Sequence, residues 1–272
     1  MFHRVLIATD NSDLVRNATE YAAELFSDGE FHVISVADTS DRSVEMSSLL
    51  MDLRKRLAEE AIDSTSAILE KKGIIPIKQI EKGDPAKEIL KYTTDKGVDL
   101  LIMATHALTA SSRFHLGGTC KRVLERVRCS SLLFSHPYEP RKPAKILNPS
   151  SLSQYSRYAS DIALSLADDF GSSVSTILIG KGDQVDSEGE RLNRLATEMG
   201  VPLEIIRSED TARMDSCKCI IEHSPSHDLL LISRGNRSVA YTFRYIYREL
   251  ALGDLEREVI VESTIPLLVV GD

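Results

Sequence analysis

Residues that could bind an anion gather between two apolar runs, Leu100–Met103 and Leu132–Phe134. Short runs of this kind are typical of strands buried on both faces of a parallel sheet. Between them the glycine pair Gly117 and Gly118 opens a helical segment. The first N–H groups of that helix would lie beside the carboxyl end of a strand, where open α/β sheets hold anionic ligands. The stretch therefore predicts a phosphate-type site, with a purely structural helix start as the alternative.

The loop before the glycine pair is polar and carries three further candidates, His106, Arg113 and His115. Each histidine could contact phosphate or be an ordinary loop histidine. Arg113 is the better phosphate candidate because a guanidinium is always charged, but a solvated loop arginine has the same pattern.

A second group of potential ligands consists of Cys217 and Cys219, with His223 and His227 downstream. Helix residues two apart point to different sides, so two such thiolates do not easily reach one ion. We therefore expect buried helix cysteines here and no metal.

Familiar catalytic motifs are absent from the sequence. It contains no Gly-x-Ser-x-Gly elbow, no Gly-x-x-x-x-Gly-Lys-Ser/Thr loop and no His-Glu-x-x-His helix. We expect a binding protein and not an enzyme, with weak hydrolytic activity as the least favoured class.

The composition of the chain argues against two classes of partner, nucleic acids and membranes. The 272-residue chain is 42% hydrophobic and 27% charged, with a net charge of −8. That acidic balance argues against nucleic-acid binding, which needs a basic face, and no apolar run approaches the ~18 residues of a membrane span. The N-terminus is not typical of a signal peptide, and the four cysteines do not form a secreted disulfide framework, so a cytoplasmic location is expected.

The elements that must position these residues alternate between strands and helices, which predicts a parallel, doubly wound α/β sheet. Apolar runs predict strands at Val5–Thr9, Phe31–Val36, Ile75–Ile80, Leu100–Met103 and Leu132–Phe134. Capping residues predict helices after Asp10-Asn11-Ser12 and after Gly83-Asp84-Pro85.

The longest predicted helix runs from about Val44 to Lys72 and ends at Gly73. Its expected inner side carries Leu49, Leu53, Leu57, Ala61 and Ile68. The mixed charges of residues 54–60 are expected to form its solvated face.

After a proline-rich linker, Pro137–Pro143, the pattern restarts. Lys145–Ser151 aligns with Arg4–Asp10, and Leu252–Val270 repeats Leu116–Phe134 without a gap. We interpret this as a duplication of one α/β domain, with domains at residues 1–137 and 144–272.

Taken together, five segments make the chain resemble a tandem member of the universal stress protein family. They are VLIATD, the alanine-rich first helix, KGDPAKEIL, DLLIMATHA and LGGT…RVLERV…SLLF. The resemblance implies a stress-response protein with two five-stranded sheets of strand order 3-2-1-4-5, paired through their last strands, Leu132–Phe134 and Leu267–Val270. Two tandem chains could pack further into a homodimer.

Members of this family that bind ATP carry Gly-x-x-Gly, nine residues, then Gly-Ser or Gly-Thr. The first domain keeps the spacing with Ala104–Ala107 and Gly117-Gly118-Thr119 but has alanine in place of two glycines. By resemblance, Asp10 would accept hydrogen bonds from adenosine and Val36 would line the adenine slot. The full set of residues implied in nucleotide binding is Ala8, Thr9, Asp10, Val36, Met103, Ala104, His106, Ala107, Arg113, Gly117, Gly118 and Thr119. Gly117→Val is expected to block phosphate approach and to spare the fold.

The second domain departs further from the motif. Ser151 replaces Asp10, and Asp254 puts a carboxylate where a phosphate would sit. The segment between Arg234 and Gly253 is longer and aromatic. We therefore expect this site to be degenerate.

Two hypotheses follow. In the first, ATP or AMP, with or without Mg²⁺, binds domain one, orders residues 107–119 and changes the surface shown to a protein partner. In the second, the alanines mark a lost site and the chain is a nucleotide-independent scaffold. The retained spacing favours the first hypothesis, and the alanines favour the second.

Overall fold

The structure, a computed structural model, describes residues 2–40, 48–106, 116–209, 213–234 and 254–271. The chain forms two compact units, Met1–Arg141 and Lys142–Asp272, and each is described here by itself. Their boundary lies within the proline-rich segment 137–143.

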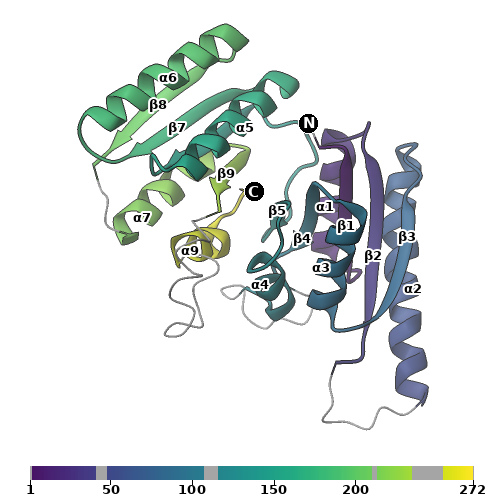
Figure 1. Ribbon diagram of the computed structural model, residues 1–272. Coiled ribbons are helices and arrows are strands. Elements are labelled where there is room, and N and C mark those ends of the chain that lie inside the picture. Colours follow the sequence, from purple (N-terminus) through teal and green to yellow (C-terminus); the bar gives the residue numbers. More distant parts are fainter. Residues whose placement is uncertain (1, 41–47, 107–115, 210–212, 235–253, 272) are drawn as a thin grey trace. The chain divides into compact units, whose positions relative to one another are not determined.

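The first unit is a parallel sheet with helices packed against it (Figure 1). Its hydrogen-bonded order is β3-β2-β1-β4-β5, which confirms the predicted order 3-2-1-4-5. Helix α1 packs against α2, and α3 packs against α4. The elements are β1 (Arg4–Ala8), α1 (Asp13–Leu25), β2 (Glu30–Asp38), α2 (Ser48–Lys71), β3 (Ile77–Gly83), α3 (Pro85–Lys96), β4 (Leu100–Ala104), α4 (Gly118–Leu124) and β5 (Ser130–Phe134).

The second unit repeats this order as β8-β7-β6-β9-β10. Its elements are β6 (Lys145–Ser150), α5 (Gln154–Phe170), β7 (Ser173–Ile179), α6 (Asp183–Met199), β8 (Leu203–Ser208), α7 (Arg213–His223), η1 (Ser224–Ser226), β9 (Leu229–Ser233), α9 (Asp254–Glu262) and β10 (Leu267–Val270). Pairing between the last strands of the two units stays a prediction.

The two units also match in the backbone conformation before their first helices. Ser12 caps α1 and Ser153 caps α5, each through its side-chain oxygen. The residue before each cap, Asn11 or Leu152, has φ +64°. Left-handed backbone is uncommon outside glycine, so its recurrence at matching positions supports a common origin for the two units.

The core face of α2 differs from the one predicted. Leu49, Leu53 and Leu57 are 78%, 51% and 54% exposed. Ala61 is buried as predicted, together with Ala58, Ile62, Thr65, Ser66 and Leu69. The leucine spacing is that of a core stripe, but mostly small residues, one position further along the helix, face the sheet and allow close approach. Ile68 is half-buried, and residues 44–47 of the predicted helix lie outside the described residues.

Strand β3 begins two residues later than predicted, at Ile77, and lies at an edge of its sheet as expected. Pro76 has no N–H to donate to a neighbouring strand, so pairing with β2 starts at the next residue. The capping predictions around the following helix are confirmed. Asp84 caps α3, Pro85 occupies its first turn, and Gly97 ends it with φ +60°.

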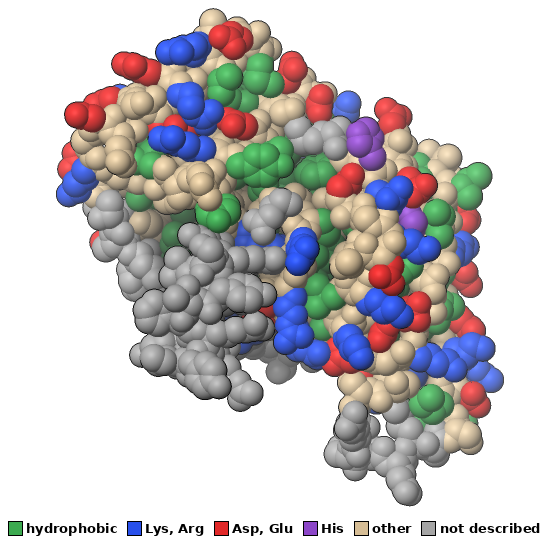
Figure 2. All heavy atoms as spheres, viewed as in Figure 1, with side chains coloured by type: hydrophobic (Ala, Val, Ile, Leu, Met, Phe, Trp, Pro, Cys, Tyr) green, Lys and Arg blue, Asp and Glu red, His purple; other side chains and the backbone are tan. Residues whose placement is uncertain are grey.

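The surface carries charges of both signs. Lys and Arg side chains are interspersed with Asp and Glu side chains on the face shown in Figure 2. Among the described residues, no helix is both long and apolar enough to cross a membrane.

Candidate functional site

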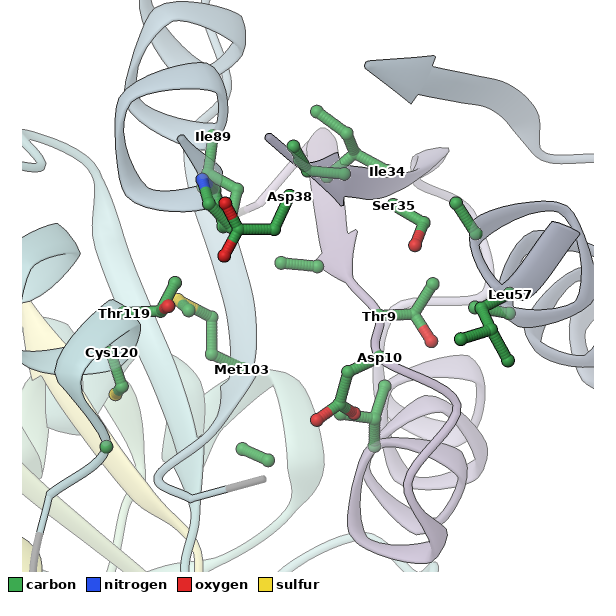
Figure 3. A pocket seen from close by; sticks show the side chains of 18 of the residues that line it. Thr9, Asp10, Ile34, Ser35, Asp38, Leu57, Ile89, Met103, Thr119 and Cys120 are labelled. Carbon is green, nitrogen blue, oxygen red and sulfur yellow. The ribbon is translucent and has the colours of Figure 1, made fainter. Parts of the chain in front are cut away.

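A cavity of about 460 Å³ lies at the carboxyl ends of β1, β2 and β4 (Figure 3). Strand order reverses between β1 and β4, because the chain first adds strands on one side of β1 and then on the other. Loops leaving neighbouring strands diverge at such a point, and open α/β sheets bind ligands there. The volume is within the usual range for small-molecule sites.

The structure brings together ten of the residues singled out from the sequence. They are Ala8, Thr9, Asp10, Val36, Met103, Ala104, His106, Gly117, Gly118 and Thr119. The other two, Ala107 and Arg113, lie outside the described residues, as does His115. That these residues bind nucleotide stays a prediction.

A tight turn fixes Asp10 at the rim of the cavity. The Ser12 N–H donates to Asp10 Oδ1 over 3.0 Å. The hydroxyl of buried Thr9 accepts from the Asn11 N–H over 3.2 Å and lies 2.8 Å from the Thr65 hydroxyl. The Asp10 side chain is exposed and projects toward the cavity (Figure 3). Its position suits it to accept hydrogen bonds from a bound molecule.

The middle of the cavity is apolar. Ile34 and Val36 line it from β2, Met103 from β4 and Ile89 from α3. Figure 3 shows Ile34, Ile89 and Met103 around one hollow, with Leu57 of α2 on its far side. These side chains form an apolar slot in the cavity.

Most of the apolar residues that line the cavity were not predicted from the sequence. Alternation along β2 places Ile34, Val36 and Asp38 on one face of the strand, and that signal could have added Ile34 and Asp38 to the set. The contributions of Leu57 and Ile89 depend on how α2 and α3 pack, which no local pattern reveals.

Gly117 and Gly118, which both line the cavity, have different environments. The Gly117 N–H donates to the Thr105 carbonyl over 2.7 Å, so it is already used within the loop. A Cβ at Gly117 would lie 3.1 Å from that same oxygen, whereas a Cβ at Gly118 would meet nothing within 4 Å. A valine at position 117 would press on the Thr105 backbone, so the expectation that Gly117→Val spares the fold stays a prediction. A side chain introduced at Gly118 can therefore fill the cavity without a clash at its Cβ.

An ion pair joins α3 to α4, the helix that begins at the glycine pair. Arg122 Nη2 lies 2.6 Å from both carboxylate oxygens of Asp84. The same carboxylate caps α3 by accepting from the Lys87 N–H over 3.0 Å. Hydrogen bonding to Arg122 is the main reason that the pKa of Asp84 lies below its usual value. The ion pair thus fixes α3 and α4, which both line the cavity, relative to each other.

Cys120 lines the cavity from α4 with a thiol whose reactivity is reduced by burial. Its side chain is buried, and burial raises the pKa of its thiol to about 12. The thiolate needed for reactivity is therefore scarce at neutral pH.

The second unit has different residues at the matching place. Exposed Ser151 stands at the position of Asp10. The Leu152 side chain lies over Gly180, which follows β7, so closely that a Cβ there would be 2.7 Å from Leu152 Cδ1. An apolar side chain thus covers the end of β7 at the position where Asn11 stands in the first unit. The aromatic segment 235–253 lies outside the described residues.

The expectation of buried cysteines in α7 is confirmed for Cys217 and not for Cys219. Cys217 is buried, Cys219 is half-buried, and His223 Nδ1 lies 2.8 Å from the Cys219 carbonyl oxygen. Within the described part of the chain, no group of three His, Cys, Asp or Glu residues is arranged to hold a metal ion.

The fold and the cavity define a class: tandem doubly wound α/β proteins with a cavity at the switch point of the first sheet. Residues 1–135 match the family model described as the universal stress protein family. The chain therefore belongs to the universal stress protein family.

Individual relatives agree with this assignment. Universal stress protein MJ0531 of Methanocaldococcus jannaschii is 29% identical over 143 residues, which cover 50% of this chain and 84% of that protein. YxiE of Bacillus subtilis is 24% identical over 146 residues, covering 49% of this chain and 99% of that protein. A crystal structure of a universal stress protein from Archaeoglobus fulgidus covers 99% of this chain and 97% of its own, with 18% identity and a TM-score of 0.78. At that identity the likeness shows the tandem fold and nothing further.

Proposed function

We propose that the first unit is a regulatory adenine-nucleotide-binding module, which takes ATP or AMP in the cavity at the ends of β1, β2 and β4. The observation that carries the proposal is that three kinds of lining residue surround the same cavity. Asp10 supplies an acceptor, Ile34 and Met103 supply apolar faces, and Gly118 leaves open space where a phosphate could approach.

The chemistry of a nucleotide suits these walls. A purine ring would be covered by apolar side chains, and the ribose hydroxyls would donate to the Asp10 carboxylate. Ala104, where the nucleotide-binding motif has glycine, adds one methyl group to the lining, and the cavity is present with that methyl group in place. One solved universal stress protein is described as a complex with cAMP; the proposal for this chain rests on the cavity itself.

The proposed role is binding, not turnover. Burial raises the pKa of the Cys120 thiol in the lining, so its reactive thiolate form is scarce at neutral pH. Occupancy of the cavity would change residues 107–119 and the surface shown to a protein partner. Any Mg²⁺ would enter with the triphosphate.

Isothermal titration of the full chain with ATP tests the proposal. Asp10→Ala removes a hydrogen bond to a charged group, so we expect affinity to fall about tenfold or more. Gly118→Val fills the open space and should abolish binding. Ser151→Ala, the matching change in the second unit, is the control and should leave the affinity unchanged. Equal affinity of wild type and Gly118→Val would refute the placement of the phosphates.

A further inference from the structure

Arg54 lies in the wall of the cavity, although its sequence context predicts a solvated helix face. Its side chain is half-buried and lines the cavity from α2. The reason is helical geometry: Arg54 is one turn before Ala58, so it continues the buried face formed by Ala58, Ala61 and Ile62. Among the described residues that line the cavity, it is the only one with a permanent positive charge.

A hydrogen bond orients the guanidinium. Arg54 Nη1 donates to the carbonyl oxygen of Asp38, the last residue of β2. The remaining N–H groups of a planar guanidinium are then fixed in direction, so they can meet an acceptor with little further loss of side-chain freedom.

Asp38 also supplies a carboxylate at the end of β2, the same residue whose main-chain carbonyl Arg54 contacts. Asp38 lies on the face of β2 that also presents Ile34 and Val36, and its side chain points into the hollow near Ile89 (Figure 3). The Ser40 N–H and hydroxyl both donate to Asp38 Oδ1, over 2.9 and 2.6 Å. These bonds hold the carboxylate in place beside the apolar slot.

The two side chains offer a donor and an acceptor with no net charge. A pair of this kind gives little attraction to a phosphate, because the carboxylate offsets the field of the guanidinium. It suits a neutral group that presents an acceptor next to a donor. The edge of a purine does so, since a ring nitrogen adjoins an amino group in adenine.

We propose that Arg54 and Asp38 read the edge of the nucleotide base: Arg54 donates to a ring nitrogen, and Asp38 accepts from the neighbouring amino group. The proposal rests on nucleotide binding in this cavity and adds the residues that select the base. It also orients the ligand, with the base toward α2 and the phosphates toward Gly118.

The test compares ATP with adenosine, using titration calorimetry on the full chain. Arg54→Met should weaken both ligands by the same factor, about tenfold or more, because the lost contact is to the base that they share. Arg56→Met is the matched control, since Arg56 is exposed on the same helix, and should bind like wild type. Thermal melting of each variant checks that it is folded.

Arg54→Lys separates the base contact from a phosphate contact. It keeps the charge but loses the planar fork, so a base-reading arginine predicts weaker binding of both ligands. Loss of ATP affinity with adenosine unchanged would show a phosphate contact and overturn the proposal, as would wild-type affinity of Arg54→Met. Failure of the wild type to bind ATP would instead refute the proposed function, and the base-reading role with it.

Discussion

Asp84 stabilises the fold next to the cavity, and two substitutions of it should lower the free energy of unfolding by different amounts. Its carboxylate caps α3 through the Lys87 N–H and pairs with Arg122 of α4. Asp84→Ala removes both interactions. Asp84→Asn keeps an acceptor for the cap but loses the charge that pairs with Arg122, because asparagine is as good an N-cap as aspartate.

The magnitudes follow from exposure and geometry. An N-cap contributes about 1 kcal/mol to the free energy of unfolding. The Arg122 side chain is 46% exposed and that of Asp84 23%, so solvent screens the pair to about 0.5 kcal/mol. We therefore expect Asp84→Ala to cost roughly 1.5 kcal/mol and Asp84→Asn roughly a third of that.

Acidification should remove the difference between wild type and Asp84→Asn. The pKa of Asp84 is lowered in the folded chain, so its contribution is present above the unfolded pKa, near 4, and is lost as the pH falls through the folded pKa. Urea unfolding followed by circular dichroism measures these free energies, since the chain has no tryptophan. Equal costs for the two variants at pH 7 would refute the capping argument.

Two further predictions concern buried groups. Glu188 is 1% exposed and accepts from Arg191 while pairing with Arg157 at 3.0 Å. Glu188→Ala should lower the free energy of unfolding by about 1–3 kcal/mol in urea melts, because the two guanidiniums lose their shared acceptor but can still reach water; a neutral effect would contradict this. Cys120, with its pKa near 12, should react with iodoacetamide far more slowly than half-buried Cys219 in the native chain, as measured by peptide mass mapping. Equal labelling rates would show that the thiol is accessible.

Local signals predicted most of the first unit. Ser12 and Asp84 mark helix starts through chemistry that acts within a few residues, and the structure places both as the sequence indicates. The residues predicted at the ends of β1 and β4 also converge, because parallel strands bring their carboxyl ends to one edge of the sheet.

Properties that depend on packing were not predictable from the sequence. The stripe of Leu49, Leu53 and Leu57 has the spacing of a core face and is exposed, and the same one-residue offset turns Arg54 inward. Gly117 looks like a phosphate ligand in sequence, but its N–H is used by the Thr105 carbonyl, a contact that only the folded loop defines.

Equilibrium dialysis of the full chain against labelled ATP, repeated with Gly118→Val, tests the central claim most directly. We predict saturation at one nucleotide per chain, because the second unit has Ser151 and Leu152 where the first has Asp10 and Asn11, and loss of that nucleotide in the variant. No binding at millimolar ATP, or one nucleotide retained by Gly118→Val, would contradict nucleotide binding in the cavity of the first unit.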